Sequence, residues 1–202
     1  MASKGYDNAG VKELLLQALE TERGGIKVYT AAINAAVNED LRKEFEEYLE
    51  ETTRHEEILT RVFGELGMDT EEMSPGRQVC AHNGAALVEA IEMAIANADP
   101  AAAELVACEC VVLAETKDHS NWELIGKVAD SADDEVTRVL KPAFDEVEDQ
   151  EDHHLYHTKG WCRELWIQSL GMPAVLPPPE EVKQVETAIG AARAEQARED
   201  ML

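Results

Sequence analysis

The segment of residues 146–161, EVEDQEDHHLYHTKGW, gathers acids and imidazoles that could bind a metal ion, and it holds three of the chain's six histidines. Glu151 and His154 lie three residues apart, and on an α-helix this spacing places two side chains on one face. That face can present a carboxylate and an imidazole to the same ion. Trp161, seven residues after His154, continues the face as a buried residue. A solvated acidic face is the alternative, because acidic helices contain such pairs by chance.

Three other stretches carry an acid or a histidine in a related setting. Glu22 lies seven residues before Tyr29, and Glu115 lies seven residues before Trp122, so each acid shares a helix face with an aromatic residue. His55 lies in the segment EETTRHEEIL. The order along the chain is acid, histidine, acid, histidine. In a bundle these groups would meet in the middle, where carboxylates could neutralise and bridge two divalent ions and histidines could cap each end.

The elements that would position these residues are helices. Apolar residues recur with helical periodicity, and no strand pattern is present. Four long helices and one shorter helix are predicted, over residues 10–38, 40–66, 75–98, 100–129 and 133–170. Ser74-Pro75 and Asp99-Pro100 are typical helix starts, while Pro142 predicts a kink or a late start in the last long helix. Short turns within each pair of long helices predict antiparallel partners and an all-α bundle.

The chain is predicted to have a bundle followed by a tail. Residues 1–170 would form the antiparallel four-helix bundle, with the shorter helix between its second and third helices. Residues 171–202 would form a proline-rich linker and a C-terminal docking helix over 181–200. Gly24 and Gly25 interrupt the first helix, and we expect them to let a neighbouring helix or a ligand approach closely.

The composition excludes several classes of function. The formal net charge is −24, from 42 acids against 18 bases, which argues against nucleic acid and anionic membrane surfaces as partners. No signal peptide is visible, and no uncharged apolar run approaches the ~18 residues of a membrane span. Cys108 and Cys110 have the wrong spacing for a zinc site, so we expect buried thiols in a reducing compartment, the cytoplasm.

With these residues in place, the chain resembles the ferritin-like superfamily, in particular bundles of the rubrerythrin and bacterioferritin type. The resemblance extends over residues 10–168 and rests on the acids, histidines and aromatic residues described above. It implies a four-helix bundle with a di-iron or di-manganese centre that handles oxygen or peroxide. It further implies that Glu22 and Glu115 are terminal or bridging carboxylates, that Glu151 and His154 act as a pair, and that His55 is the capping imidazole of the second helix.

One position departs from the family pattern. A glutamate is expected three residues before the histidine of the second helix, and Thr52 occupies that place. Glu51, four residues before His55, shares its face and could substitute. The alternative is an asymmetric site in which one ion binds well and the other weakly.

The predicted function is that of a non-haem carboxylate protein with two iron or manganese ions, zinc being an alternative, and with oxidoreductase chemistry on O₂, peroxide or ferrous iron. The predicted metal ligands are Glu22, Glu51, His55, Glu115, Glu151 and His154. His119 and His157 lie one turn from a ligand and could orient it. We expect a homodimer formed through the bundle or the tail helix.

Two other functions remain open from the sequence. His55, His119 and His154 could hold a single zinc or nickel ion in a bundle of the DinB type. Alternatively, the bundle could be a metal-free dimerising module, which Thr52 favours. Inward-facing acids without a metal would repel one another and be costly to bury, which argues against the metal-free alternative.

Overall fold

The structure, a computed structural model, describes residues 5–202, and over this part of the chain its regular elements are all helical. The elements are α1 (Asn8–Ala35), α2 (Glu39–Glu65), α3 (Pro75–Asn97), α4 (Pro100–Ala129), α5 (Glu135–Ser169), α6 (Pro179–Val182), α7 (Ala188–Gln196) and a short 3₁₀ helix (Ala197–Met201). The prediction of an all-α antiparallel bundle is confirmed.

The helix starts follow local signals in the sequence. The Ser74 side chain accepts a hydrogen bond from the Arg77 backbone N–H at 3.0 Å, and Pro75 occupies the first helical position of α3. Asp134 and Thr137 form a reciprocal capping box at the start of α5. Pro142 lies inside α5, which begins at Glu135, so the predicted late start is wrong.

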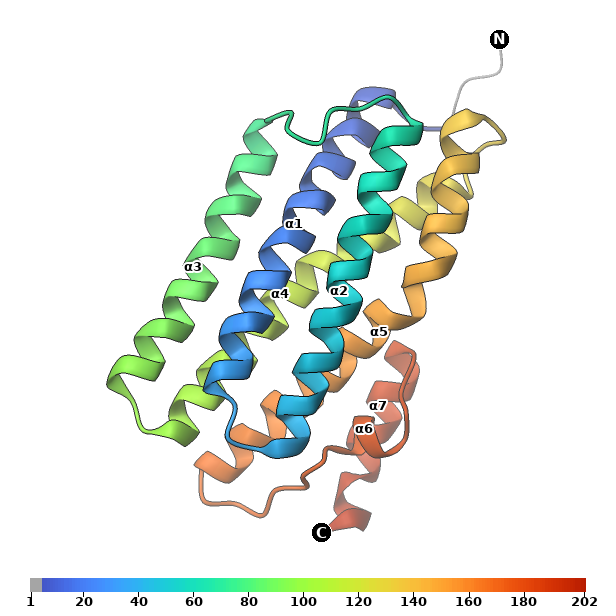
Figure 1. The fold of residues 1–202 in the computed structure, drawn as a ribbon. Helices are drawn as coiled ribbons and strands as arrows, with labels where there is room; N and C mark the ends of the chain where they lie inside the picture. Colours follow the sequence, from blue (N-terminus) through green and yellow to red (C-terminus); the bar gives the residue numbers. More distant parts are fainter. Residues whose placement is uncertain (1–4) are drawn as a thin grey trace.

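Helices α1, α2, α4 and α5 form the bundle, and α3 lies outside it against α1 and α4 (Figure 1). Glycine permits the close approach of α3 to α1, because a Cβ added to Gly84 would lie 3.3 Å from the Gly24 Cα. A Cβ on Gly25 would lie 3.2 Å from the Thr52 methyl carbon on α2. The prediction that Gly24 and Gly25 allow close approach is therefore confirmed, and each glycine serves a different neighbouring helix.

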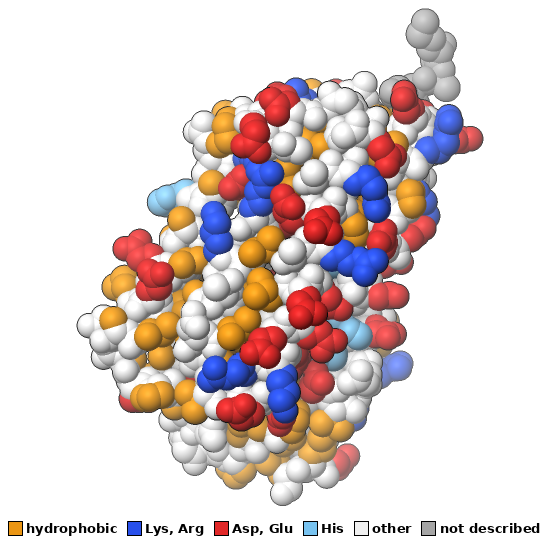
Figure 2. Space-filling view, in the orientation of Figure 1, with side chains coloured by type: hydrophobic (Ala, Val, Ile, Leu, Met, Phe, Trp, Pro, Cys, Tyr) orange, Lys and Arg blue, Asp and Glu red, His pale blue; other side chains and the backbone are white. Residues whose placement is uncertain are grey.

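Helix α3 is less buried than its neighbours. It exposes Val79, Met93 and Ile95, and Figure 2 shows hydrophobic side chains gathered on the side of the molecule where α3 lies. We expected no segment long and apolar enough to cross a membrane. By length and composition alone, α3 is such a segment. No other helix in the described residues passes that test, and one such helix is weak evidence for a membrane segment.

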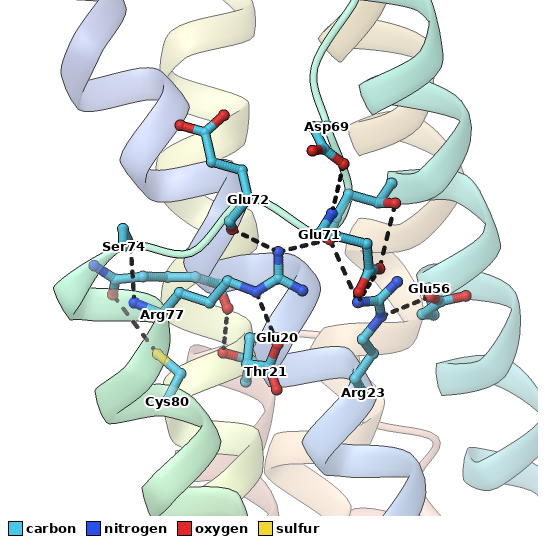
Figure 3. A network of polar contacts seen from close by, with 12 residues as sticks. Glu20, Thr21, Arg23, Glu56, Asp69, Glu71, Glu72, Ser74, Arg77 and Cys80 are labelled. Carbon is cyan, nitrogen blue, oxygen red and sulfur yellow. Dashed lines mark hydrogen bonds and ion pairs between the residues drawn. The ribbon is translucent and has the colours of Figure 1, made fainter.

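Two arginines fix the loop between α2 and α3 to the bundle (Figure 3). The buried Arg77 guanidinium donates to Glu20 on α1 at 2.9 Å and to the Thr70 and Glu72 carbonyl oxygens at 2.6 and 2.9 Å. Arg23 on α1 donates to Glu56 on α2 at 3.0 Å and to Glu71 of the loop at 3.3 Å. The first turn of α3 is thus held by charged groups as well as by packing.

Two hydrophobic clusters fill the bundle, and a polar layer separates them. On α1, Leu19 belongs to one cluster and Val28 to the other, with Glu22 between them. On α5, Val147 and Trp161 belong to different clusters in the same way. Apolar packing on both sides of the layer holds the four helices rigidly, so polar side chains between them are fixed in place.

The C-terminal residues pack along α5 in short pieces (Figure 1). The predicted single helix over 181–200 is wrong, since α6, α7 and the 3₁₀ helix replace it. Gly160 permits close contact, because a Cβ there would lie 2.5 Å from a Glu180 carboxylate oxygen. Arg163 donates to both oxygens of Glu180 at 2.7 and 2.9 Å. The buried Glu164 accepts from the Val175 N–H at 2.8 Å.

Candidate metal centre

The polar layer brings acids and imidazoles from four helices into one place. Glu22 comes from α1, His55 from α2, Glu115 from α4, and Glu151 and His154 from α5. Each side chain is at most 2% exposed. Helical periodicity accounts for this convergence, because each residue lies on the face that its helix turns towards the bundle interior.

These residues form two ligand groups that share one carboxylate. The first group is Glu22, His55 and Glu151, and the second is Glu115, Glu151 and His154. Within each group, the potential ligand atoms all lie within 4.8 Å of one another. His55 Nδ1 lies 3.0 Å from Glu151 Oε1, and His154 Nδ1 lies 3.5 Å from Glu115 Oε2. Glu151 is therefore placed to bridge two ions.

A chain of hydrogen bonds orients both histidines. His55 Nε2 lies 2.8 Å from Gln150 Oε1, the Gln150 amide donates to Glu51 at 2.7 Å, and the other Glu51 oxygen lies 2.8 Å from His154 Nε2. Amide and carboxylate oxygens only accept hydrogen bonds, so each Nε2 carries a proton. The two Nδ1 atoms are left facing the carboxylates. Partners of this kind fix the tautomer and direction of metal-binding histidines.

Glu51, which the sequence predicted as a ligand, lies outside the two ligand groups, and so does the neighbouring Thr52. The structure places Glu51 on the outer side of His154, where it is half-buried and bonded to Nε2 rather than grouped with the Nδ1 atoms. Thr52 is buried against Gly25. Helix α2 thus contributes an imidazole and an orienting carboxylate to the layer.

Asp118 is a buried acid of the layer that sequence reasoning missed. It lies three residues after Glu115 on α4, is 3% exposed, and its charge raises the pKa of Glu22. The available signal was the spacing itself, since Glu115-x-x-Asp118 repeats the interval of Glu151-x-x-His154. The layer therefore contains four fully buried carboxyl groups rather than three.

The acids raise one another's pKa values. Burial raises the pKa of Glu151 to about 8, with Glu115 as the next cause. The pKa values of Glu22 and Asp118 are raised well above their ordinary range, first by burial and then by neighbouring acids. If all four acids ionised, the layer would carry four negative charges, which two divalent cations would balance.

The two histidines are shifted in opposite directions. Burial and the nearby His154 lower the pKa of His55 to about 4, so His55 is neutral and Nδ1 has a free lone pair. Burial also opposes charge on His154, but the carboxylates of Glu115 and Glu51 outweigh it and raise its pKa to about 10. Without an ion, a proton on His154 offsets part of the negative charge.

Several atoms of the layer have no hydrogen-bond partner among the described residues. They are one oxygen each of Glu22, Glu115 and Asp118, both oxygens of Glu151, and Nδ1 of His55 and His154. A buried polar atom without a partner is costly, and such atoms are few in folded proteins. Here these atoms belong to the five residues of the two ligand groups and to Asp118. The residues present therefore fit a pair of divalent metal ions.

The two histidines that the sequence suggested could orient a ligand, His119 and His157, lie outside these groups. His119 Nε2 lies 2.7 Å from Asp152 at the edge of a cavity of about 380 Å³ that Glu151 also lines. The three-histidine alternative requires His119 to meet His55 and His154, and its pairing with Asp152 disfavours that arrangement. His157 contacts Glu181 of α6 instead.

Comparison with known proteins gives one family match. Residues 12–108, slightly less than half of the chain, match the family described as Domain of unknown function (DUF892). That domain is known to belong to the ferritin-like superfamily, in agreement with the resemblance noted from the sequence. The matched region carries Glu22 and His55 and ends before Glu115. No curated protein and no solved structure matches the chain significantly.

Proposed function

We propose that the bundle is a dinuclear metal protein whose ions are iron or manganese and whose chemistry is oxidoreduction of O₂, peroxide or ferrous iron. The observation that carries this proposal is the pair of buried ligand groups that share Glu151, with their inward atoms lacking other partners. Carboxylates and imidazoles together suit iron and manganese, and a shared carboxylate can hold two ions side by side.

Each residue has a defined role in this proposal. Glu22 and His55 would hold one ion, Glu115 and His154 would hold the other, and Glu151 would be shared by both. Asp118, whose charge acts on Glu22, would supply on α4 the carboxylate that Thr52 does not supply on α2. The four helices would then contribute unequal numbers of ligands, but the number of carboxylates would be that of the expected site.

The surroundings favour redox chemistry in a dry site. Iron or manganese bound there would supply the electrons for reduction of O₂ or peroxide. The Trp122 indole N–H donates to Glu22 at 2.7 Å, which keeps one oxygen of that carboxylate fixed. The Tyr48 ring lies 4.2 Å, centroid to centroid, from His154 and covers it from the side of α2. The aromatic rings exclude bulk water from the imidazoles.

The first experiment measures bound metal per chain by elemental analysis on untagged protein reconstituted with ferrous iron or Mn²⁺. The informative variant is Glu151→Gln, which removes the shared charge while keeping the shape. The matched control is Glu148→Gln, one turn earlier on α5 and exposed. We expect wild type and control to bind the same number of ions and Glu151→Gln to bind about two fewer.

Activity assays follow on the same three proteins. Oxygen consumption with ferrous iron and decay of hydrogen peroxide should be present in wild type and Glu148→Gln and lost in Glu151→Gln. Equal metal content in all three proteins would overturn the dinuclear site. A full complement of metal with neither activity would overturn the oxidoreductase function while leaving the metal site in place. No bound metal after reconstitution would favour a structural bundle.

A further inference from the structure

A second cluster of ligand-type side chains lies outside the polar layer, where the C-terminal tail meets the bundle. It consists of Glu44 on α2, His157 on α5 and Glu181 on α6, with one potential ligand atom from each within 4.8 Å of the others. His157 Nδ1 lies 2.8 Å from Glu181 Oε2 and 3.7 Å from Glu44 Oε1. Glu44 and His157 are buried, and Glu181 is partly exposed.

The backbone of the tail determines which nitrogen of His157 faces these acids. His157 Nε2 lies 2.9 Å from the Val185 carbonyl oxygen. A carbonyl oxygen can only accept, so Nε2 must carry the proton and donate. Without an ion, Nδ1 also carries a proton and donates it to Glu181 Oε2 at 2.8 Å, so Nδ1 faces two carboxylates and a cation bound between them would take the place of that proton. Metal-binding histidines are commonly held in this way, with the remote N–H bonded to a backbone carbonyl.

The buried carboxylate of the cluster is also held by donors. Tyr48 donates its hydroxyl hydrogen to Glu44 Oε1 at 2.7 Å, and the Trp161 indole N–H donates to Glu44 Oε2. Both donors favour the ionised carboxylate, which is the form that binds a cation. Glu44 is thus fixed in direction before any ion arrives, and only Glu181 can move with the tail.

We propose that Glu44, His157 and Glu181 bind one divalent cation that fastens the C-terminal segment to the bundle. The donor set of one imidazole and two carboxylates suits Zn²⁺, with the partly exposed side of Glu181 leaving a position for water. The ion would join three elements, α2, α5 and α6, so its binding requires the tail to be docked.

This site is independent of the dinuclear centre in its ligands and in its purpose. None of its three residues belongs to the groups that share Glu151. Its third ligand, Glu181, comes from the tail, and the bundle alone supplies only Glu44 and His157. Binding an ion to a docked tail lowers the ratio of undocked to docked tail by the factor 1 + [ion]/Kd.

The test titrates Zn²⁺ into the full chain after chelator treatment and compares wild type with Glu181→Gln. Glu195→Gln is the matched control, since it also removes one acid from the tail, at an exposed position of α7. Bound zinc is counted by elemental analysis, and amide hydrogen exchange is followed over residues 179–196. At zinc about ten times its dissociation constant, exchange of the tail should slow about tenfold in wild type and control.

We expect Glu181→Gln to bind one zinc ion fewer than the control and to lose the zinc-dependent slowing. Glu44→Gln, changed on the bundle side, should give the same two results with an unaltered tail sequence. Equal zinc content and equal slowing in Glu181→Gln and control would overturn the proposal and leave the dinuclear centre untouched. Conversely, zinc protection of the tail that persists in Glu151→Gln would support this site even if the dinuclear proposal failed.

Discussion

Glu20 and Glu22 lie two residues apart on α1, yet their surroundings are opposite. Glu20 accepts from the buried Arg77 guanidinium at 2.9 Å, so the negative charge meets a positive one supplied by α3. Glu22 is fully buried, and the charged groups that shift it most are Asp118 and Glu151, both acids. The Trp122 N–H gives it one hydrogen bond but no charge.

The two glutamates differ in the source of the compensating positive charge: the chain supplies it for Glu20 and does not supply it for Glu22. Around Arg77 the protein supplies both partners, and the network is complete when the chain folds. In the polar layer, protons or cations from solution must complete the balance. Removing a partner should therefore harm the first region and not the second, while adding a metal should help only the second.

The largest effect is expected in the region that balances itself. Arg77→Ala leaves Glu20 without its partner and frees two loop carbonyls, and breaking a buried pair costs about 3–5 kcal/mol of unfolding free energy. Urea unfolding in the presence of chelator measures it. Arg54→Ala is the control, since Arg54 forms an exposed pair with Glu146, and it should cost less than about 1 kcal/mol. Equal costs would remove the contrast between the regions.

The next effect is stabilisation by metal. With Mn²⁺ at ten times its dissociation constant, the free energy of unfolding should increase by about 1.4 kcal/mol per site, or about 2.8 kcal/mol for two sites. The gain should be the same in Arg77→Ala as in wild type, because Arg77 touches none of the ligands, and most of it should vanish in Glu151→Gln. Thermal unfolding with and without Mn²⁺ measures it. A gain that survives Glu151→Gln would place the ions elsewhere.

A smaller effect is the pH dependence of metal binding. Without metal, Glu151 has a pKa of about 8 and His154 a pKa of about 10, so at pH 7 both hold protons that an ion must displace. Affinity should therefore increase with pH, by about 1.4 kcal/mol per pH unit for each displaced proton. Calorimetry in buffers of different ionisation enthalpy should count at least two protons released at pH 7, with further ones from Glu22 and Asp118 where their raised pKa values keep them protonated, and about one fewer at pH 9. Release of none would mean that the acids are already ionised.

The smallest effect is expected for Glu22→Gln in the metal-free protein. Burial and neighbouring acids raise the pKa of Glu22 and so favour its neutral carboxyl form, which glutamine resembles in shape and charge. The amide oxygen can still accept from Trp122. The free energy of unfolding should change by less than about 1 kcal/mol, measured in chelator. A loss as large as that of Arg77→Ala would show that Glu22 is ionised and that the protein itself compensates its negative charge.

The sequence predicted the bundle well because its signals are local. Helical periodicity, the proline starts and the glycine pair act within one or two turns, and the same periodicity predicted the faces of Glu22, Glu115 and His154. The role of Glu51 was harder to predict. It lies on the ligand face of α2, but its partners are Gln150 and His154 on α5, and the packing of the two helices decides which side of the imidazole it reaches.

Two other features required the three-dimensional structure for similar reasons. Asp118 has the spacing of a ligand, but a single acid on an apolar helix face gives no indication of what it will meet. The break in the tail comes from docking, since Gln184 adopts a positive φ of 50° and the following Val185 carbonyl reaches His157. A helix continued through this point would turn that carbonyl into its own hydrogen-bond ladder, away from α5.

The five residues of the two ligand groups come from four different helices and span most of the bundle sequence, from position 22 to position 154. No single helix holds either group: the first needs α1, α2 and α5, whereas the second needs α4 and α5. A full complement of bound metal would therefore report that all four helices of the bundle have assembled. A chain that has lost any one of these four helices to proteolysis or to a stalled folding step would lack a ligand of at least one ion, so a full complement of two ions would count finished molecules.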